Sequence, residues 1–290
     1  MNKADTLYVD QARAILKEEL VKETRAEWET GIKAGAKVAF VTVSRYDLSK
    51  EFPIMSLRKQ LWKNAIEEIF WIHQKFSNNI KDLNSKIWNQ WADENGSIGT
   101  AYGYQAGKKY KWDDVPFECT QIERVFYLLK NEPSSRRMYI TLRNPAEAIN
   151  KRLDECAHTV EFTVKNNKLN MVLLQRSGDY LTASSPGSWN EIQYATLQLA
   201  IAHCTGLEPG EFVHTVTNHH IYDRHEEQVK ELINLYEKTF KKIENGEIFD
   251  KFPKLIIKTE EKDFFKLKPE DFEIINYEPL SIVKNIKVAK

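Results

Sequence analysis

Between Cys156 and Tyr222 the sequence gathers side chains that could perform covalent chemistry on a nucleotide. Cys156 supplies a thiol, Arg176 a guanidinium group and Asn190 an amide. A thiolate is a strong nucleophile, forked guanidinium groups bind phosphate, and an amide can both donate to and accept from the edge of a base. Together, these side chains indicate an enzyme that binds a nucleotide and attacks it.

These side chains lie in short motifs, and further motifs precede them. Two neighbouring arginines, a pair of tryptophans three positions apart and an acidic residue before a tryptophan are the most distinctive features. The motifs are Glu67-Glu68-Ile69-Phe70-Trp71, Ile87-Trp88-Asn89-Gln90-Trp91, Ala101-Tyr102-Gly103, Ser134-Ser135-Arg136-Arg137, Gln175-Arg176-Ser177-Gly178-Asp179, Trp189-Asn190 and His219-His220-Ile221-Tyr222. In this order, from about Val38 to Lys290, the motifs resemble those of the folate-dependent thymidylate synthases.

The resemblance implies a nucleotide site. Cys156 would add to C6 of a uracil ring, and Asn190 would read N3 and O4, since cytosine-acting relatives tend to carry Asp there. The tandem arginines of the family come from the other subunit, so the resemblance also implies a homodimer that shares Arg136 and Arg137. The residues expected to hold the phosphate and the sugar 3′-hydroxyl are Arg136, Arg137, Gln175, Arg176, Ser177, His220 and Tyr222.

The resemblance also implies a folate site beside the nucleotide. Glu68 would relay protons as general acid and base, and Tyr102 would support that relay. Trp88 and Trp91 would lie against the folate, and Asp179 would hydrogen-bond its pterin ring. Among the basic residues expected near the folate glutamate tail are Arg58 and Lys59.

The implied activity is the reductive methylation of dUMP to dTMP with 5,10-methylenetetrahydrofolate as co-substrate and without a metal. A dUMP hydroxymethylase of the same fold, in which water replaces the hydride, is the nearer alternative. A non-catalytic nucleotide- or RNA-binding relative is the more distant one, and it would not need Cys156 or Glu68.

Each of these residues also has a purely structural interpretation. A lone cysteine is most often a small apolar filler, and Asn190 could simply cap a helix. A tryptophan pair can belong to the core, and paired arginines usually face solvent.

The sequence departs from the family pattern at several positions. An arginine that the family carries before the first strand is missing, and Lys33 is the expected substitute. Glu155 stands where many members have Pro before the cysteine, and residues 182–188 replace a glycine-rich loop. Most departures lie toward the folate, so they bear on its geometry more than on the nucleotide.

Composition limits the class of protein. The chain has 290 residues with 42 acidic and 42 basic side chains. This balance argues against a surface that binds nucleic acid, which would carry a basic excess. Three widely spaced cysteines, a charged amino-terminal stretch and the lack of a long apolar run predict a soluble, cytoplasmic protein that binds no membrane.

The periodicity of the sequence predicts the elements that position these side chains. We expect one α+β domain over residues 1–290, and the resemblance adds a large mixed sheet flanked by helices and dimerising sheet to sheet. The expected helices cover residues 8–30, 60–76, 144–156, 190–204 and 225–244, and the expected strands cover residues 38–43, 137–142, 160–164, 169–173 and 211–217. Asn166-Asn167 should turn a hairpin, Gly206 should end the helix before it, and short strands should follow Phe249.

Overall fold

The computed structural model describes residues 1–22, 24–148, 153–283 and 286–289. Its centre is a mixed sheet in the order β1-β2-β9-β7-β6-β5, with β8 beside β9. β7 and β8 run parallel to β9, and the other pairs in this sheet are antiparallel. The strands are β1 (Leu20–Val21), β2 (Ala36–Asp47), β3 (Lys109–Lys111), β4 (Glu118–Thr120), β5 (Tyr139–Thr141), β6 (Ala157–Lys165), β7 (Lys168–Gln175), β8 (Gly178–Asp179), β9 (Glu208–Tyr222), β10 (Lys254–Ile257) and β11 (Phe272–Ile275).

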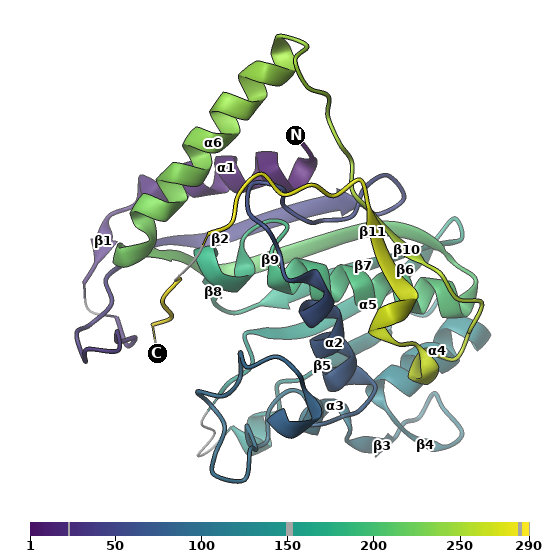
Figure 1. The fold of residues 1–290 in the computed structure, drawn as a ribbon. Coiled ribbons are helices and arrows are strands. Elements are labelled where there is room, and N and C mark those ends of the chain that lie inside the picture. Colours follow the sequence, from purple (N-terminus) through teal and green to yellow (C-terminus); the bar gives the residue numbers. More distant parts are fainter. Residues whose placement is uncertain (23, 149–152, 284–285, 290) are drawn as a thin grey trace.

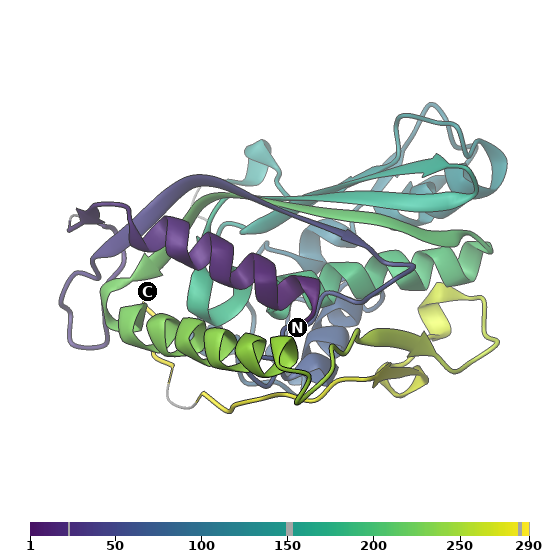
Figure 2. The same cartoon turned by 90° about the horizontal axis from the view of Figure 1, so that it is seen from above.

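The longer helices lie on one side of this sheet, as Figure 2 shows for α1, α5 and α6. α1 and α6 lie side by side in Figure 2, and α2, labelled in Figure 1, packs against α5. The single-domain α+β fold with a mixed sheet and flanking helices is therefore confirmed. The helices are α1 (Lys3–Leu16), α2 (Trp62–His73), α3 (Gly103–Ala106), α4 (Gln121–Asn131), α5 (Trp189–Thr205) and α6 (Glu226–Glu244).

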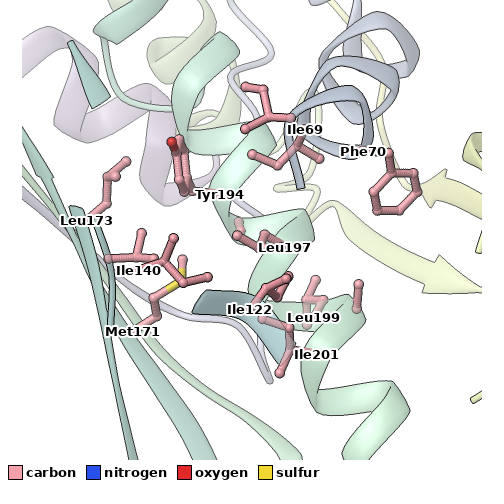
Figure 3. Close-up of a cluster of buried hydrophobic side chains, with 14 of the residues drawn as sticks. Ile69, Phe70, Ile122, Ile140, Met171, Leu173, Tyr194, Leu197, Leu199 and Ile201 are labelled. Atoms are coloured by element: carbon pink, nitrogen blue, oxygen red, sulfur yellow. The ribbon is translucent and has the colours of Figure 1, made fainter. Parts of the chain in front are cut away.

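The main core lies between the sheet and α5. Figure 3 shows Tyr194 and Leu197 of α5 among side chains from α2, α4 and the sheet, such as Ile69, Ile122 and Met171. α5 is apolar on nearly every side, because the sheet covers one face and α2 covers another. As expected, it ends at Gly206, whose φ of 73° is in the left-handed region that glycine adopts without strain.

Several predicted elements are confirmed, although their limits move. The hairpin forms between β6 and β7, and Asn166 and Asn167 both take positive φ in its turn. β9 extends beyond the predicted 211–217 and so carries His220 and Tyr222 on a strand. The tail strands pair as β10 and β11.

The first predicted helix, residues 8–30, is wrong in its limits. α1 begins after Asn2, whose side chain accepts a hydrogen bond from the Asp5 backbone in a reciprocal capping box. It ends at Leu16, and the chain then pairs Leu20 and Val21 with β2. Pairing with β2 thus overrides the helical periodicity of the residues after Leu16.

The predicted helix 144–156 is also wrong where it is described. Only the short 3-10 helix η2 (Pro145–Glu147) forms, and residues 149–152 lie outside the described part. Arg176 donates from Nε to the Glu155 carbonyl and from Nη2 to the Asp154 carbonyl, at 3.0 and 2.6 Å. These carbonyls are therefore engaged by a side chain from the end of β7 rather than by a helix.

No helix among the described residues combines the length and the apolar character needed to cross a bilayer.

Candidate active site

A cavity of about 550 Å³ opens at the ends of β7, β8 and β9, between α5 and the segment that carries the tryptophan pair. Most of the residues that the sequence singled out line it. They are Glu68, Trp88, Trp91, Tyr102, Cys156, Gln175, Ser177, Asp179, Asn190, His220 and Tyr222. Residues far apart in the chain thus meet around one space large enough for small organic molecules.

A second hollow of about 1200 Å³ adjoins this cavity. The two share Trp91, Ser177, His220 and Tyr222 as lining residues. The second hollow also contains three guanidinium groups, from Arg25, Arg143 and Arg176. It is therefore the cationic end of the site, suited to an anionic group.

Cys156 directly precedes β6 and lines the cavity. Burial raises the pKa of this thiol above its ordinary value, and the positive charge of Arg176 opposes the rise only in part. Arg176 alone would lower this pKa, but the effect of burial is larger. In this structure, the thiol holds its proton more firmly than a free cysteine does.

Tyr102 fixes the backbone around Cys156. The Cys156 N–H donates to the Tyr102 hydroxyl oxygen at 3.1 Å, and the Tyr102 N–H donates to Glu155 Oε1 at 3.1 Å. The φ of Tyr102 is 43° and its ψ is −102°, which is a strained conformation for a residue with a large side chain. Such strain persists where the surroundings over-determine the backbone, as these two bonds do here.

Arg176 is held by its neighbours beside the cysteine. Its Nε lies 3.0 Å from Asp154 Oδ2, and Arg143 Nη2 lies 3.5 Å from the same oxygen. With the two backbone bonds already described, this arrangement orients the guanidinium group along the wall of the cationic hollow.

Glu68 is a buried carboxylate at the inner end of the cavity. Burial raises its pKa from 4.5 to about 7, although a hydrogen bond from Gln193 favours the charged form. Gln193 Nε2 donates to Oε1 at 2.8 Å, while Oε2 has no hydrogen-bond partner. A carboxyl group with a pKa near 7 can both give and take a proton at neutral pH.

Asn190 is the second residue of α5, and Ser188 precedes the helix as its N-cap. The helix-cap interpretation of Asn190 is therefore wrong. Its Oδ1 accepts from Ser184 Oγ at 3.3 Å, and its Nδ2 donates to Gln193 Oε1 at 3.2 Å. The amide thus lies in the cavity with a defined orientation.

Of the two adjacent histidines on β9, only His220 lines the cavity. Its ring packs edge-on against Tyr222, with centroids 4.7 Å apart. His219 is buried, and its Nδ1 lies 2.6 Å from Thr42 Oγ1 on β2. This placement is compatible with the expectation, based on the resemblance, that His220 rather than His219 contacts the nucleotide.

Trp88, Trp91 and Tyr102 form an aromatic wall. The ring centroid of Trp88 lies 5.4 Å from that of Trp91 and 5.1 Å from that of Tyr102. Asp179 lines the same cavity, and its buried Oδ2 has no hydrogen-bond partner. Burial is the largest single influence on Asp179 and raises its pKa, but His225, with Nδ1 at 3.4 Å from Oδ1, together with His220 and Thr182 outweighs it, so the pKa is lowered.

Three predicted site residues, and Lys33 with them, line neither the cavity nor the cationic hollow of this chain, whereas Arg176 lines the hollow only. Arg58 is buried outside the lining of either hollow, with its charge near Tyr8 and Asp179. Arg136 and Arg137 are exposed between α4 and β5. Lys33, the expected substitute for an arginine, is ion-paired with Glu27 at 2.6 Å instead.

Sequence reasoning missed several residues of the site. Arg25 lines the cationic hollow, and it supplies the positive charge that the sequence analysis expected from Lys33. Glu191 and Gln193 were passed over because the segment that contains them is otherwise apolar. Two polar residues in the first turn of a buried helix were the available signal, since buried charges need partners.

Among the described residues, no three His, Cys, Asp or Glu side chains gather closely enough to hold a metal ion.

The chain is similar to known proteins over nearly its whole length. The family model described as "Thymidylate synthase" matches residues 6–289. A thymidylate synthase of Bacillus mojavensis is 35% identical over 284 residues, which cover 96% of each chain, and thymidylate synthase 1 of Bacillus subtilis strain 168 is 36% identical over 88% of this chain and 87% of its own. The solved structure of thermostable thymidylate synthase A from Bacillus subtilis superimposes with a TM-score of 0.86 at 32% identity and covers 99% of both chains.

Proposed function

This chain belongs to the thymidylate synthase family of methyltransferases, and on that premise we propose that it converts dUMP to dTMP with 5,10-methylenetetrahydrofolate. The observation that carries the proposal is the meeting of Cys156, Asn190 and Glu68 in one cavity. A nucleophile, a base-reading amide and a carboxyl group with a pKa near 7 are the parts that the reaction requires.

The proposed roles of the chain's own residues follow from their positions. The Cys156 thiol gives up its proton and its sulfur adds to C6 of uracil, so that the π electrons of the C5–C6 double bond move toward C5 and the O4 carbonyl. C5 then bonds the one-carbon unit from the folate and afterwards releases its own proton. Asn190 hydrogen-bonds N3 and O4, and Glu68 exchanges protons near that carbonyl. Arg25 and Arg176 face the phosphate from the cationic hollow. In the last step, loss of the thiolate restores the C5–C6 bond.

The aromatic wall and Asp179 fit the folate. A flat pterin can stack on Trp88, and the unpartnered Oδ2 of Asp179 can accept a hydrogen bond from its ring nitrogens. The folate supplies the one-carbon unit and the hydride that reduces it to a methyl group, becoming dihydrofolate. The aromatic wall, Val288 and Ala289 line the cavity and exclude water from the base.

The test is one incubation of the protein with dUMP and 5,10-methylenetetrahydrofolate. We expect equal amounts of dTMP and dihydrofolate, with the nucleotide identified by mass and the folate by its absorbance. Formation of 5-hydroxymethyl-dUMP and tetrahydrofolate would instead identify a hydroxymethylase. If no product forms, the result favours the non-catalytic binding protein.

We further propose that the chain acts as a homodimer that shares its sites. The exposed side chains of Phe40, Val41 and Val43 on β2 support the proposal, because apolar surface on a sheet favours packing against a second subunit. The loop that carries Arg136 and Arg137 is anchored by Arg124, which donates from Nη1 to the Arg137 carbonyl at 2.9 Å and pairs with Asp114. These two arginines could therefore reach the phosphate bound by a second subunit.

Mixing two inactive variants tests this shared site. Cys156→Ser lacks the nucleophile, and Arg136→Glu lacks the phosphate contact. After subunit exchange, one site of each mixed dimer contains both an intact Cys156 and an intact Arg136, so activity should return, to about a quarter of wild type if subunits pair at random. Continued inactivity of the mixture, or an active monomer in sedimentation, contradicts the shared site.

A further inference from the structure

The peptide group that joins Glu155 to Cys156 is held at both of its polar atoms. Its carbonyl oxygen, which belongs to Glu155, accepts from Arg176 Nε at 3.0 Å. Its N–H, which belongs to Cys156, donates to the Tyr102 hydroxyl oxygen at 3.1 Å. Because a peptide group is planar, these two bonds fix the plane from which the Cys156 side chain extends. The position of the thiol therefore depends on Arg176 and Tyr102.

Arg176 and Tyr102 are each held in turn by an acidic residue that precedes the cysteine. Asp154 Oδ2 lies 3.0 Å from Arg176 Nε. Glu155 Oε1 accepts from the Tyr102 N–H at 3.1 Å. Glu155, Tyr102 and Cys156 thus form a closed loop, in which the Glu155 side chain holds the Tyr102 backbone and the Tyr102 side chain holds the Cys156 backbone.

The charge of Glu155 does not itself favour the reaction. Burial is the largest cause of the raised pKa of the Cys156 thiol, Arg176 opposes it, and the negative charges of Asp154 and Glu155 raise this pKa further. Glu155 is also 0% exposed, and a buried carboxylate is costly unless it is hydrogen-bonded. A side chain that opposes the thiolate in this way must have another role beside the nucleophile, and its bond to Tyr102 indicates that role.

The Tyr102 backbone needs such a bond. Its φ of 43° lies in a region that residues with a side chain seldom adopt. The next residue, Gly103, packs so closely on Ser77 that an added Cβ would lie 1.9 Å from the Ser77 carbonyl oxygen. Strained backbone of this kind persists only where its surroundings hold it. Because Glu155 stands where many members of the family have Pro, this bond is a feature of this chain.

We propose that Glu155 is a positioning residue for the nucleophile, because its carboxylate locks the strained Tyr102 backbone and the Tyr102 hydroxyl then holds Cys156 where its sulfur reaches C6 of the base. This role rests on the proposed function, in which that sulfur attacks C6. A displacement of the sulfur by about 1 Å slows such an attack by on the order of 10²-fold, whereas the groups proposed to bind dUMP stay in place.

The test measures how fast each variant forms a covalent complex with 5-fluoro-dUMP and 5,10-methylenetetrahydrofolate, and how tightly it binds dUMP. Quenched mixing with intact-protein mass gives the rate, and calorimetry gives the affinity. Glu155→Ala removes the acceptor and should slow complex formation by roughly 10- to 100-fold, with dUMP affinity within about 2-fold of wild type. Glu155→Met fills more of the same space without an acceptor, and it tests the same point if the alanine variant does not fold.

Two further variants separate positioning from a general loss of packing. Glu155→Gln keeps an acceptor for the Tyr102 N–H without the charge, so it should form the complex at least as fast as wild type. Tyr102→Phe removes the hydroxyl through which Glu155 acts. Adding Glu155→Ala to Tyr102→Phe should therefore cause little further slowing, whereas independent effects would multiply.

Asp5→Ala is the matched control. Asp5 is also 0% exposed, and it accepts from the Ser56 and Leu57 backbone N–H groups at 2.7 and 3.1 Å, outside the lining of the cavity and the hollow. Its loss should lower stability to urea without slowing complex formation.

Three results would overturn the inference while leaving the proposed function intact. They are fast complex formation in the folded alanine or methionine variant of Glu155, equal slowing in Glu155→Gln and Glu155→Ala, and effects of Glu155→Ala and Tyr102→Phe that simply multiply. A wild-type protein that forms no covalent complex would overturn the proposed function, and the inference with it.

Discussion

Cys156→Ser should lower turnover at least roughly 10³-fold, because a serine hydroxyl in the same place remains protonated and is a poor nucleophile toward C6. The variant should also fail to form a covalent complex with folate and a dUMP that carries fluorine at C5. Fluorine cannot leave as the C5 proton does, so wild-type protein should stall with the base attached to its sulfur. Steady-state assays and intact-protein mass measure the two effects.

The other two cysteines are the controls for this prediction. Cys119 is buried next to α4, and Cys204 lies near the far end of α5, so neither lines the cavity or the hollow beside it. Cys119→Ser and Cys204→Ser should keep both turnover and adduct formation. An adduct mapped to Cys204 by peptide mass spectrometry would show that the nucleophile has been misassigned.

Glu68→Gln should lower kcat by roughly 10²- to 10⁴-fold, the usual contribution of a general acid or base. The amide can still meet Gln193 but cannot carry a proton to or from the base. Wild-type kcat should show an inflection near pH 7, where burial holds the pKa of Glu68, and the residual activity of the variant should lack it. Turnover within a few-fold of wild type would exclude Glu68 from proton transfer.

The same carboxyl group should change the stability of the protein with pH. The folded protein holds this proton up to about pH 7, whereas the unfolded chain releases it near pH 4.5. Raising the pH through this window therefore favours unfolding of the wild type. Gln cannot ionise, so Glu68→Gln should gain stability relative to wild type between these values, by up to about 3 kcal/mol, as measured by urea unfolding at pH 5 and pH 8.

Part of the site could be predicted from the sequence because its residues lie on predicted strands and helices or directly after them. Ser177 and Asp179 follow β7 directly, and the two-residue step from His220 to Tyr222 keeps both on one face of β9. The apolar run after Asn190 predicted the buried helix α5, which begins at Trp189 and so carries Asn190 in its first turn.

The remainder depended on contacts between distant segments. Arg25 reaches the cationic hollow because the chain after α1 pairs with β2 instead of continuing as a helix. Glu191 meets His214 only because α5 packs across the sheet that contains β9. The pKa of Cys156 is raised because the thiol is buried, and a sequence motif does not reveal burial. The nearby Arg176 would by itself lower this pKa.

The central claim is that the methyl group is completed by a hydride from the folate. The most direct measurement uses 5,10-methylenetetrahydrofolate labelled with deuterium at the carbon that gives up this hydride. We expect each dTMP formed to carry one deuterium in its methyl group and unlabelled dihydrofolate to accumulate in equal amount. A nucleotide product without deuterium, with the label retained in tetrahydrofolate, would contradict it.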